Sequence, residues 1–389
     1  MTQLLIKLFI KDYDKTGEIN VRKRYGILSG IVGVIFNIIL FALKFFAGTL
    51  TSSIALTADA FNNLSDAASA VVTLVGFRLA ARPADKSHPF GHGRIEYVSG
   101  LIVSMVIIMM GVELIRSSID KMLHPESVEI NMVSSVIIIL SIFIKAWVYL
   151  FNRKIAKSIN SSAIHATSMD SLSDVVATLV VFICMIITHL TGVNIDGIAG
   201  ILVALFIIYT GYSTAKETLD PLLGQSPSPD LIDKIRAEVM SFEQISGVHD
   251  IMVHNYGPNK TLISLHAEVP CDIDIIEIHD TIDMAERRIN KMFDCETVIH
   301  MDPIATNDKD INDKKDAVLS IVKSIDESIT IHDFTFSPGE HKSNLIFDVV
   351  IPDNFKLSDT EVVKIISDKI KDIDESYNAI INVDKAFYN

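Results

Sequence analysis

The sequence predicts an all-α membrane bundle of six helices, followed by small α+β modules of which the second is an apparent repeat of the first. Apolar residues make up 49% of the 389-residue chain and concentrate before residue 215. There they form six stretches near the ~20 residues that a helix needs to cross a bilayer. After residue 226 this pattern gives way to short alternating strands and amphipathic helices, which is typical of α+β structure.

The six predicted spans cover residues 26–50, 54–80, 96–117, 130–151, 163–189 and 197–214. Lys and Arg gather before the first span and after the second and fourth, whereas the other connections contain few of them. The positive-inside rule therefore predicts a multi-pass cell-membrane protein with both termini in the cytoplasm. Residues 1–24 are charged and lack a cleavable signal pattern, so we expect them to form a cytoplasmic N-terminal segment.

The region that follows the spans is strongly acidic. Residues 215–389 contain 17 Lys and Arg against 34 Asp and Glu. Such a surface argues against nucleic acid as a partner and suits cations. The three cysteines form no CxxC motif, so they support neither a disulfide framework nor a thiolate zinc site.

Two polar pairs interrupt the apolar spans: Asn62 with Asp66 in the second, and Asp170 with Asp174 in the fifth. A spacing of four places both members of a pair on one helical face. Both pairs lie about ten residues from a membrane face, so they can meet at one depth. A charge near the bilayer centre costs at least ~2.5–3.5 kcal/mol, which favours a functional role.

Together the two pairs offer three carboxylates and one amide oxygen, an oxygen-rich cage for a divalent cation. The alternative interpretation is polar packing between helices, with aspartates held neutral by burial. Lys44 and Lys145 lie nearer to helix ends, and we interpret them as snorkelling or internally paired residues.

The connection between the second and third spans contains a second candidate site. Asp85, His88 and His92 are spaced by three and four residues, so one turn can gather them. Imidazoles with a carboxylate suit Zn, Mn or Fe. Hydrogen bonding that merely fixes the loop is the alternative interpretation.

The tail repeats one αββαβ order. The first copy is predicted at 230–242, 247–257, 261–269, 274–292 and 296–301, and the second at 312–325, 329–336, 343–351, 358–373 and 378–384. His332 matches His249 at an offset of 83, and Asp384 matches Asp302 at 82. A nearly constant offset through matched elements indicates duplication. We therefore expect a 25–215 membrane domain, a 216–303 module and a 304–389 repeat module.

The two copies differ in their candidate ligands. The first holds His249, His266, His279, His300 and Asp302, a set that favours metal because imidazole is a common metal ligand. The matching places in the second hold His332, Asp348 and Asp384, which predicts a weaker metal site or none.

The motifs ADAFNNLSDA, HPFGHGRIE and SMDSLSDV, with VHD, SLHAEV and VIHMDP in the tail, resemble those of the cation diffusion facilitator family. The resemblance covers about residues 15–303. It implies a metal–proton exchanger with a ferredoxin-like cytoplasmic domain, and a homodimer that alternates between inward-facing and outward-facing states. The sequence contains no nucleophile–base set and no phosphate-cradling glycine loop, so we expect no enzymatic activity. The second tail module has no counterpart in the usual family pattern.

The resemblance also assigns site residues. It implies a transport site at Asn62, Asp66, Asp170 and Asp174, a loop site at Asp85, His88 and His92, and a cytoplasmic site at His249, His266, His300 and Asp302, with His279 as an extra ligand. It further implies a charge interlock of Arg94 with an acidic residue after the sixth span, where Gly224 stands and Asp220 is the nearest substitute.

The side chains of the transport site resemble the manganese-exporting branch of the family, so Mn²⁺ is the expected substrate. Zn²⁺, Fe²⁺, Co²⁺ and Cd²⁺ remain alternatives. A membrane metal sensor or scaffold that transports nothing is the alternative of a different functional class.

Overall fold

A computed structural model describes residues 2–51, 54–123, 132–191, 196–258, 260–305, 308–339, 342–352 and 355–386. The chain divides into two compact units. The first contains Met1–Gln225 and Asn255–Lys260, and the second contains Ser226–His254 and Thr261–Asn389.

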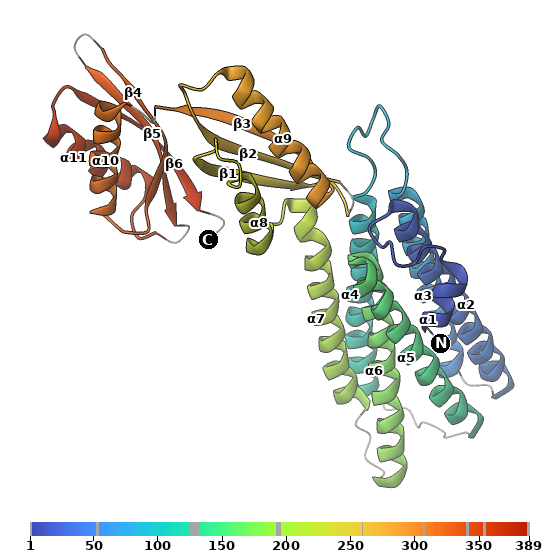
Figure 1. Ribbon diagram of the computed structural model, residues 1–389. Helices are drawn as coiled ribbons and strands as arrows, with labels where there is room; N and C mark the ends of the chain where they lie inside the picture. Colours follow the sequence, from blue (N-terminus) through green and yellow to red (C-terminus); the bar gives the residue numbers. More distant parts are fainter. Residues whose placement is uncertain are drawn as a thin grey trace. The chain divides into compact units, whose positions relative to one another are not determined.

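The first unit is helical (Figure 1). A short helix, α1 (Thr2–Phe9), precedes six long ones: α2 (Ile19–Thr51), α3 (Ile54–Ala80), α4 (Ile95–Leu123), α5 (Met132–Ile159), α6 (Ser162–Thr191) and α7 (Asp196–Leu223). The helical bundle that the sequence predicts is thus confirmed. Its helices extend beyond several predicted spans, since a helix continues past its apolar part; the connections at residues 124–131 and 192–195 lie outside the described residues.

Five helices are long and apolar enough, within the described residues, to cross a membrane: α2, α4, α5, α6 and α7. The sixth long helix, α3, contains 27 residues. Its polar stretch around Asn62 and Asp66 lowers its hydropathy, because those side chains replace apolar ones within a single turn. Among the long helices, α3 is therefore the hardest to identify as a membrane span from hydropathy, and it carries two of the candidate ligands.

Close helix packing holds the bundle together. α2 lies along α3, and α4 lies along α7. A Cβ atom at Gly26 on α2 would come 2.0 Å from the ring of Phe77 on α3, so only glycine permits this approach. Ile6 of α1 and Ile10 pack into a core with Tyr25 and Phe151, which fixes an N-terminal helix that the sequence pattern did not predict.

The second unit consists of two αββαβ repeats. The first contains α8 (Pro229–Val239), β1 (Gly247–Asn255), β2 (Thr261–Pro270), α9 (Ile275–Phe293) and β3 (Glu296–Ile304). The second contains α10 (Lys309–Lys323), β4 (Thr330–Ser337), β5 (Ser343–Pro352), α11 (Asp359–Ile373) and β6 (Tyr377–Ala386). The predicted element order is confirmed in both.

The sheets of the two repeats have matching topology. Their strand orders are β1-β2-β3 and β4-β5-β6. The pairs β2–β3 and β5–β6 are parallel, as an intervening crossover helix requires. The registers also correspond, since His266 lies opposite His300 and Asp348 lies opposite Asn382.

The cores of the repeats correspond residue by residue. The central strands β2 and β5 bury alternate residues in the same pattern, so Leu265 and Phe347 occupy equivalent, fully buried positions. Amphipathic helices α9 and α11 cover these cores with Ile282, Ile289 and Ile366. The positions that alternate with these buried residues are more exposed, and candidate ligands such as His266 and Asp348 occupy some of them.

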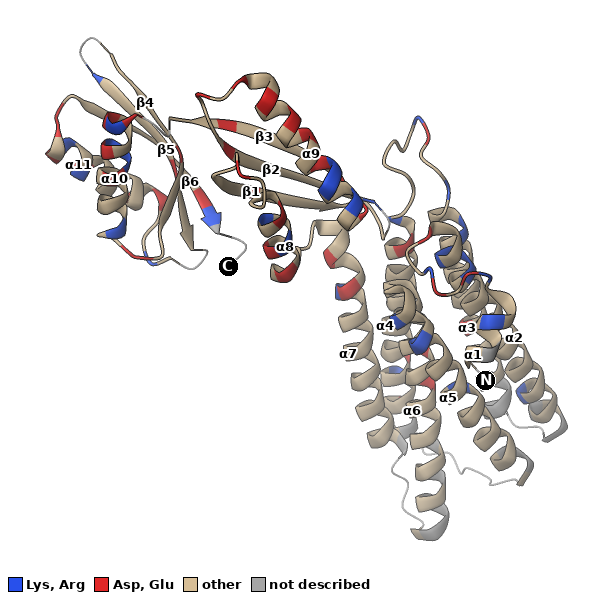
Figure 2. Cartoon of the chain, in the orientation of Figure 1, with Lys and Arg blue, Asp and Glu red and all other residues tan. Residues whose placement is uncertain are grey.

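Charge is distributed unevenly over the elements (Figure 2). The long helices of the first unit are mostly uncharged, with single charged residues inside them, whereas the elements of the second unit carry many acidic side chains. Charged groups inside the apolar helices are therefore few.

Candidate metal centres

Three carboxylates meet between the long helices α3 and α6. One oxygen each from Asp66, Asp170 and Asp174 lies within 4.8 Å of the others. The residues are 2%, 5% and 8% exposed. Hydrogen bonding between Thr73 Oγ1 on α3 and Thr167 Oγ1 on α6, at 2.9 Å, joins the same two helices. The three carboxylates therefore lie close together, as the helical spacing of the two polar pairs predicted.

Asn62 lies one turn before Asp66 on α3 and is half-buried. The spacing of four residues places its side chain on the helical face of Asp66. Its contribution of an amide oxygen to the carboxylate group stays a prediction.

The side chain of Lys145 on α5 lies among the three carboxylates. Its Nζ donates hydrogen bonds to Asp66 Oδ2 at 2.7 Å and to Asp174 Oδ2 at 2.6 Å, and the residue is 5% exposed. The sequence allowed two interpretations of Lys145, snorkelling or internal pairing, and the structure shows internal pairing. Because α5 is distant in sequence from Asp66, the spacing of residues gave no signal of this ammonium in the site.

The predicted charge interlock of Arg94 with Asp220 is not formed. The guanidinium of Arg94 donates to the backbone oxygen of Asn255 at 2.8 Å and stacks over the ring of Tyr256. A buried ion pair forms instead between Arg22 and Glu96, with Nη2 2.6 Å from Oε1. Glu96 lies in the first turn of α4 and is buried, and Arg94 is already engaged with Asn255 and Tyr256.

The loop between α3 and α4 gathers Asp85, His88 and His92 as predicted. Nitrogen atoms of both imidazoles lie 3.5 Å from carboxylate oxygens of Asp85. Backbone N–H groups of His88 and Ser87 donate to Asp85, and with the nearby imidazoles they lower the pKa of its carboxyl. The geometry fits both a metal site and a loop fixed by hydrogen bonds.

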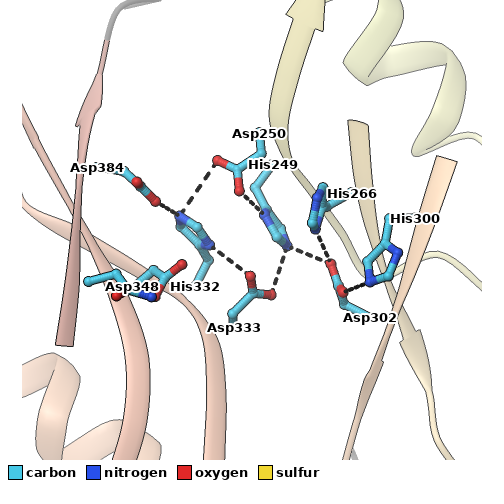
Figure 3. A network of polar contacts seen from close by, with 10 residues as sticks. His249, Asp250, His266, His300, Asp302, His332, Asp333, Asp348 and Asp384 are labelled. Carbon is cyan, nitrogen blue, oxygen red and sulfur yellow. Dashed lines mark hydrogen bonds and ion pairs between the residues drawn. The ribbon is translucent and has the colours of Figure 1, made fainter. Parts of the chain in front are cut away.

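The first tail repeat assembles its histidines around one carboxylate (Figure 3). Asp302 lies 3.3 Å from His249 Nε2, 2.9 Å from His266 Nδ1 and 3.2 Å from His300 Nε2. His249, His266 and Asp302 form a group that could hold a metal ion, together with Asp333 of the second repeat. His300 lies at the exposed rim of this group.

The structure does not bring His279 into this group, contrary to its prediction as an extra ligand. It lies on the exposed face of α9. The neighbouring Ile278 and Ile282 fill the core, so the helical period turns His279 to the surface.

Electrostatics around His249 reflect its acidic surroundings. Burial alone would lower its pKa, but hydrogen bonding to Asp250 and the nearby carboxylates of Asp333 and Asp302 raise it. The same contact with His249 lowers the pKa of Asp250. Negative charge therefore dominates this part of the tail, which favours a bound cation.

The second repeat brings His332, Asp348 and Asp384 into one group as predicted. Asp250 and Asp333, however, are site neighbours that the sequence reasoning missed. Each follows the equivalent histidine of its repeat, in VHD and IHD. This repeated dipeptide was the signal that could have identified them.

Comparison with known proteins identifies the family. The model of the cation efflux transmembrane domain matches residues 30–223, and that of the cation efflux protein cytoplasmic domain matches residues 227–304. The second tail repeat lies beyond both matched regions.

Relatives align over most of their own length. The manganese efflux system protein MneS of Bacillus subtilis is 28% identical over 70% of this chain and 94% of its own length. An uncharacterized transporter of Methanocaldococcus jannaschii is 29% identical over 70% and 96%. The cation-efflux pump FieF of Klebsiella pneumoniae is 26% identical over 68% and 88%.

These matches cover the helical unit and the first tail repeat, and they identify a multi-pass membrane transporter with a cytoplasmic C-terminal region, not an enzyme. The chain belongs to the cation efflux, or cation diffusion facilitator, family of divalent cation transporters.

Proposed function

We propose that this protein exports Mn²⁺ from the cytoplasm in exchange for protons, as a homodimer that alternates between inward-facing and outward-facing states. The observation that carries the proposal is the meeting of Asp66, Asp170 and Asp174 between α3 and α6. Buried carboxylates at one place inside an apolar bundle are costly without a cation to bind. The proposed transport site contains these three residues and Asn62.

The chemistry of these ligands favours manganese. Zinc prefers nitrogen and sulfur ligands, whereas carboxylate and carbonyl oxygens suit Mn²⁺, Mg²⁺ and Ca²⁺. Mg²⁺ gives up its waters reluctantly, and Ca²⁺ takes six to eight oxygens. Four side chains with one or two waters fit Mn²⁺ best. The name of the relative MneS agrees with this choice, while Zn²⁺, Fe²⁺, Co²⁺ and Cd²⁺ are the competing substrates.

Lys145 gives the empty site a cation of its own. Its ammonium bridges Asp66 and Asp174, and removing one partner of such a buried pair leaves uncompensated charge. An incoming divalent ion needs the same carboxylate oxygens, so it must displace the ammonium. Lys145 thereby keeps α3, α5 and α6 together between transport events, and protons that reach the carboxylates from outside favour release of the metal.

The remaining metal groups have regulatory roles in this proposal. Cytosolic metal at His249, His266, His300 and Asp302 neutralises part of the acidic tail and favours association of two protomers. The loop group of Asp85, His88 and His92 binds metal on the cytoplasmic side. A sensor that transports nothing would have no use for three carboxylates between membrane helices, which argues against that alternative.

Replacing Asp170 with Asn tests the transport site. The variant keeps the shape of the side chain but removes a carboxylate, so Mn²⁺ uptake into proteoliposomes under a pH gradient should fall to the level of protein-free vesicles. Glu113→Gln, on the exposed surface of α4, is the matched control and should transport normally. Transport by Asp170→Asn at the wild-type rate would refute the site assignment.

Asn62→His tests which ligands select the ion. An imidazole in place of the amide should raise the ratio of Zn²⁺ to Mn²⁺ transport about tenfold, equivalent to ~1.4 kcal/mol. Competition between the two ions in the same vesicles measures this ratio. Ser65→His, on an exposed position of the same helix, should leave the ratio unchanged; equal ratios in both variants would show that Asn62 does not discriminate.

Lys145→Met tests the internal cation. Loss of the ammonium leaves three carboxylates close together, so the metal-free protein should lose on the order of 3–5 kcal/mol of stability. Thermal unfolding in detergent should show a lower Tm that Mn²⁺ raises more than in the wild type. Lys157→Met, exposed on the same helix, is the control, and matching Tm values for the two variants would contradict the role of Lys145.

A further inference from the structure

The two tail repeats face each other through equivalent residues. His249 of the first repeat corresponds to His332 of the second, and Asp250 corresponds to Asp333. The two imidazole rings stack with centroids 4.4 Å apart and planes 29° apart (Figure 3). Equivalent residues in contact are the mark of a two-fold interface.

Contacts across this interface are reciprocal. His249 Nε2 lies 3.2 Å from Asp333 Oδ1, and His332 Nε2 lies 3.9 Å from Asp250 Oδ1. Each repeat therefore directs one aspartate at the histidine of the other. This is the isologous arrangement of a symmetric dimer, built here within one chain.

Contacts inside each repeat match as well. His249 Nε2 lies 3.3 Å from Asp302 Oδ2, and His332 Nε2 lies 3.3 Å from Asp384 Oδ2. Each of the two imidazole nitrogens thus has one carboxylate from its own repeat and one from the other.

The backbone holds both exchanged aspartates in an uncommon conformation. Asp250 has a φ of 49° and Asp333 a φ of 54°. Non-glycine residues adopt this left-handed conformation at a cost in free energy, and such strained residues cluster at ligand-binding sites. Its occurrence at equivalent positions of both repeats points to a shared purpose in aiming the two carboxylates.

A buried imidazole at the centre of this arrangement has carboxylates at ion-pair distance but forms no hydrogen bond with them. His332 is 6% exposed, and neither of its ring nitrogens makes a hydrogen bond within the part of the chain that the structure describes. His249 Nε2 is likewise buried without a hydrogen bond to a described residue. Buried nitrogen atoms of this kind are costly unless something else uses their lone pairs.

We propose that the two repeats of one chain jointly bind two divalent metal ions, each ion held by three residues of one repeat and one carboxylate of the other. The first centre contains His249, His266 and Asp302 with Asp333 of the second repeat. The second contains His332, Asp348 and Asp384 with Asp250 of the first repeat. The inference rests on the proposed function only for the identity of the ion.

The geometry of the ligand atoms supports all four residues of the first centre and three of the second, where Asp250 lies 3.9 Å from His332 Nε2. In the first, one ligand atom from each of the four residues lies within 4.8 Å of the others. In the second, His332, Asp348 and Asp384 meet the same limit. The Asn382 side chain donates a hydrogen bond to Asp348 Oδ1 at 2.8 Å, which orients that carboxylate as the outer partners of metal ligands do.

The two centres differ in ligand chemistry. The first offers two imidazoles and two carboxylates, a set that suits Zn²⁺, Fe²⁺ and Mn²⁺. The second offers one imidazole and three carboxylates, which shifts preference toward harder ions such as Mn²⁺.

This arrangement gives the second repeat a function. It supplies Asp333 to complete the four-residue centre on the first repeat, so metal clamps the two repeats together. Without metal, the same histidines and aspartates connect the repeats through ion pairs and through the stacked rings of His249 and His332. If these residues form that metal-free network and bind no ion, the proposal is wrong.

Metal titration of the full-length protein tests the exchanged carboxylates. The experiment uses protein in detergent that carries Asp66→Asn and Asp170→Asn, so the transport site does not contribute. Co²⁺ is the probe, since its visible spectrum reports imidazole and carboxylate coordination, and calorimetry counts the ions. Because the titration measures metal binding and not transport, failure of the proposed function would not alter the result.

Asp333→Asn should weaken binding of the ion at the first centre about tenfold or more, at least the loss seen when a residue that hydrogen-bonds to a metal ligand is removed. Asp250→Asn should weaken the other ion instead. Asp372→Asn, an exposed residue of α11, removes the same charge from the second repeat and should leave both affinities unchanged. Equal Co²⁺ affinities in all three variants would overturn the proposal.

Asparagine tolerates the left-handed backbone, so the variants should fold, and thermal unfolding without metal checks this. Hydrogen exchange on the same protein without tail substitutions gives an independent readout. Added Co²⁺ should slow exchange in both β1 and β4 together. Protection confined to the first repeat would overturn the shared centres even if a variant failed to fold.

Discussion

Three carboxylates meet the ammonium of Lys145 inside an apolar helical bundle, and the first unit depends on the balance of these buried charges. Asp66, Asp170 and Asp174 can be buried because Lys145 offsets part of their charge. The attraction holds α3, α5 and α6 together at the point where their side chains are most polar. Asp66, Asp170, Asp174 and Lys145 are all buried, so water has little access to the charges.

The same contact explains how a site can be both empty and stable. A buried ion pair contributes little net stability, but breaking it is expensive. A divalent ion that displaces the ammonium replaces one positive charge by two among three negative ones. In the proposed mechanism, this exchange always leaves a cation among the three carboxylates, as a transporter needs and a purely structural ion pair does not.

The cytoplasmic unit applies related chemistry with imidazoles. Duplication created two surfaces of the same shape, and these surfaces meet through His249 and His332. The first repeat kept His266 and His300 where the second has Asp348 and Asn382. In the proposed shared centres, the second repeat supplies Asp333 to the first repeat, while its own ligand set contains fewer nitrogen atoms.

Local patterns in the sequence predicted much of this structure. The spacing of Asp170 and Asp174 predicted a common face, and the offset between His249 and His332 predicted the duplication. Contacts between distant segments were not predictable in this way. Lys145 reaches the carboxylates because of how α5 packs, and Arg94 binds Asn255 in place of Asp220 for the same kind of reason.

The prediction for His279 went wrong for a different reason. The histidine content of the module suggested a ligand, but the helical period places this residue on the surface. Asp250 and Asp333 were missed because their function depends on a φ angle and on the facing repeat.

The central claim is that the transported ion binds where Lys145 now lies. Anomalous X-ray diffraction at the manganese edge, on crystals of the Mn²⁺-loaded protein, tests this most directly. Our account predicts a peak between α3 and α6, coordinated by Asp66, Asp170 and Asp174, with Lys145 Nζ withdrawn from both of its present partners. A metal-loaded structure with Lys145 still bridging Asp66 and Asp174, and no peak between these helices, would contradict it.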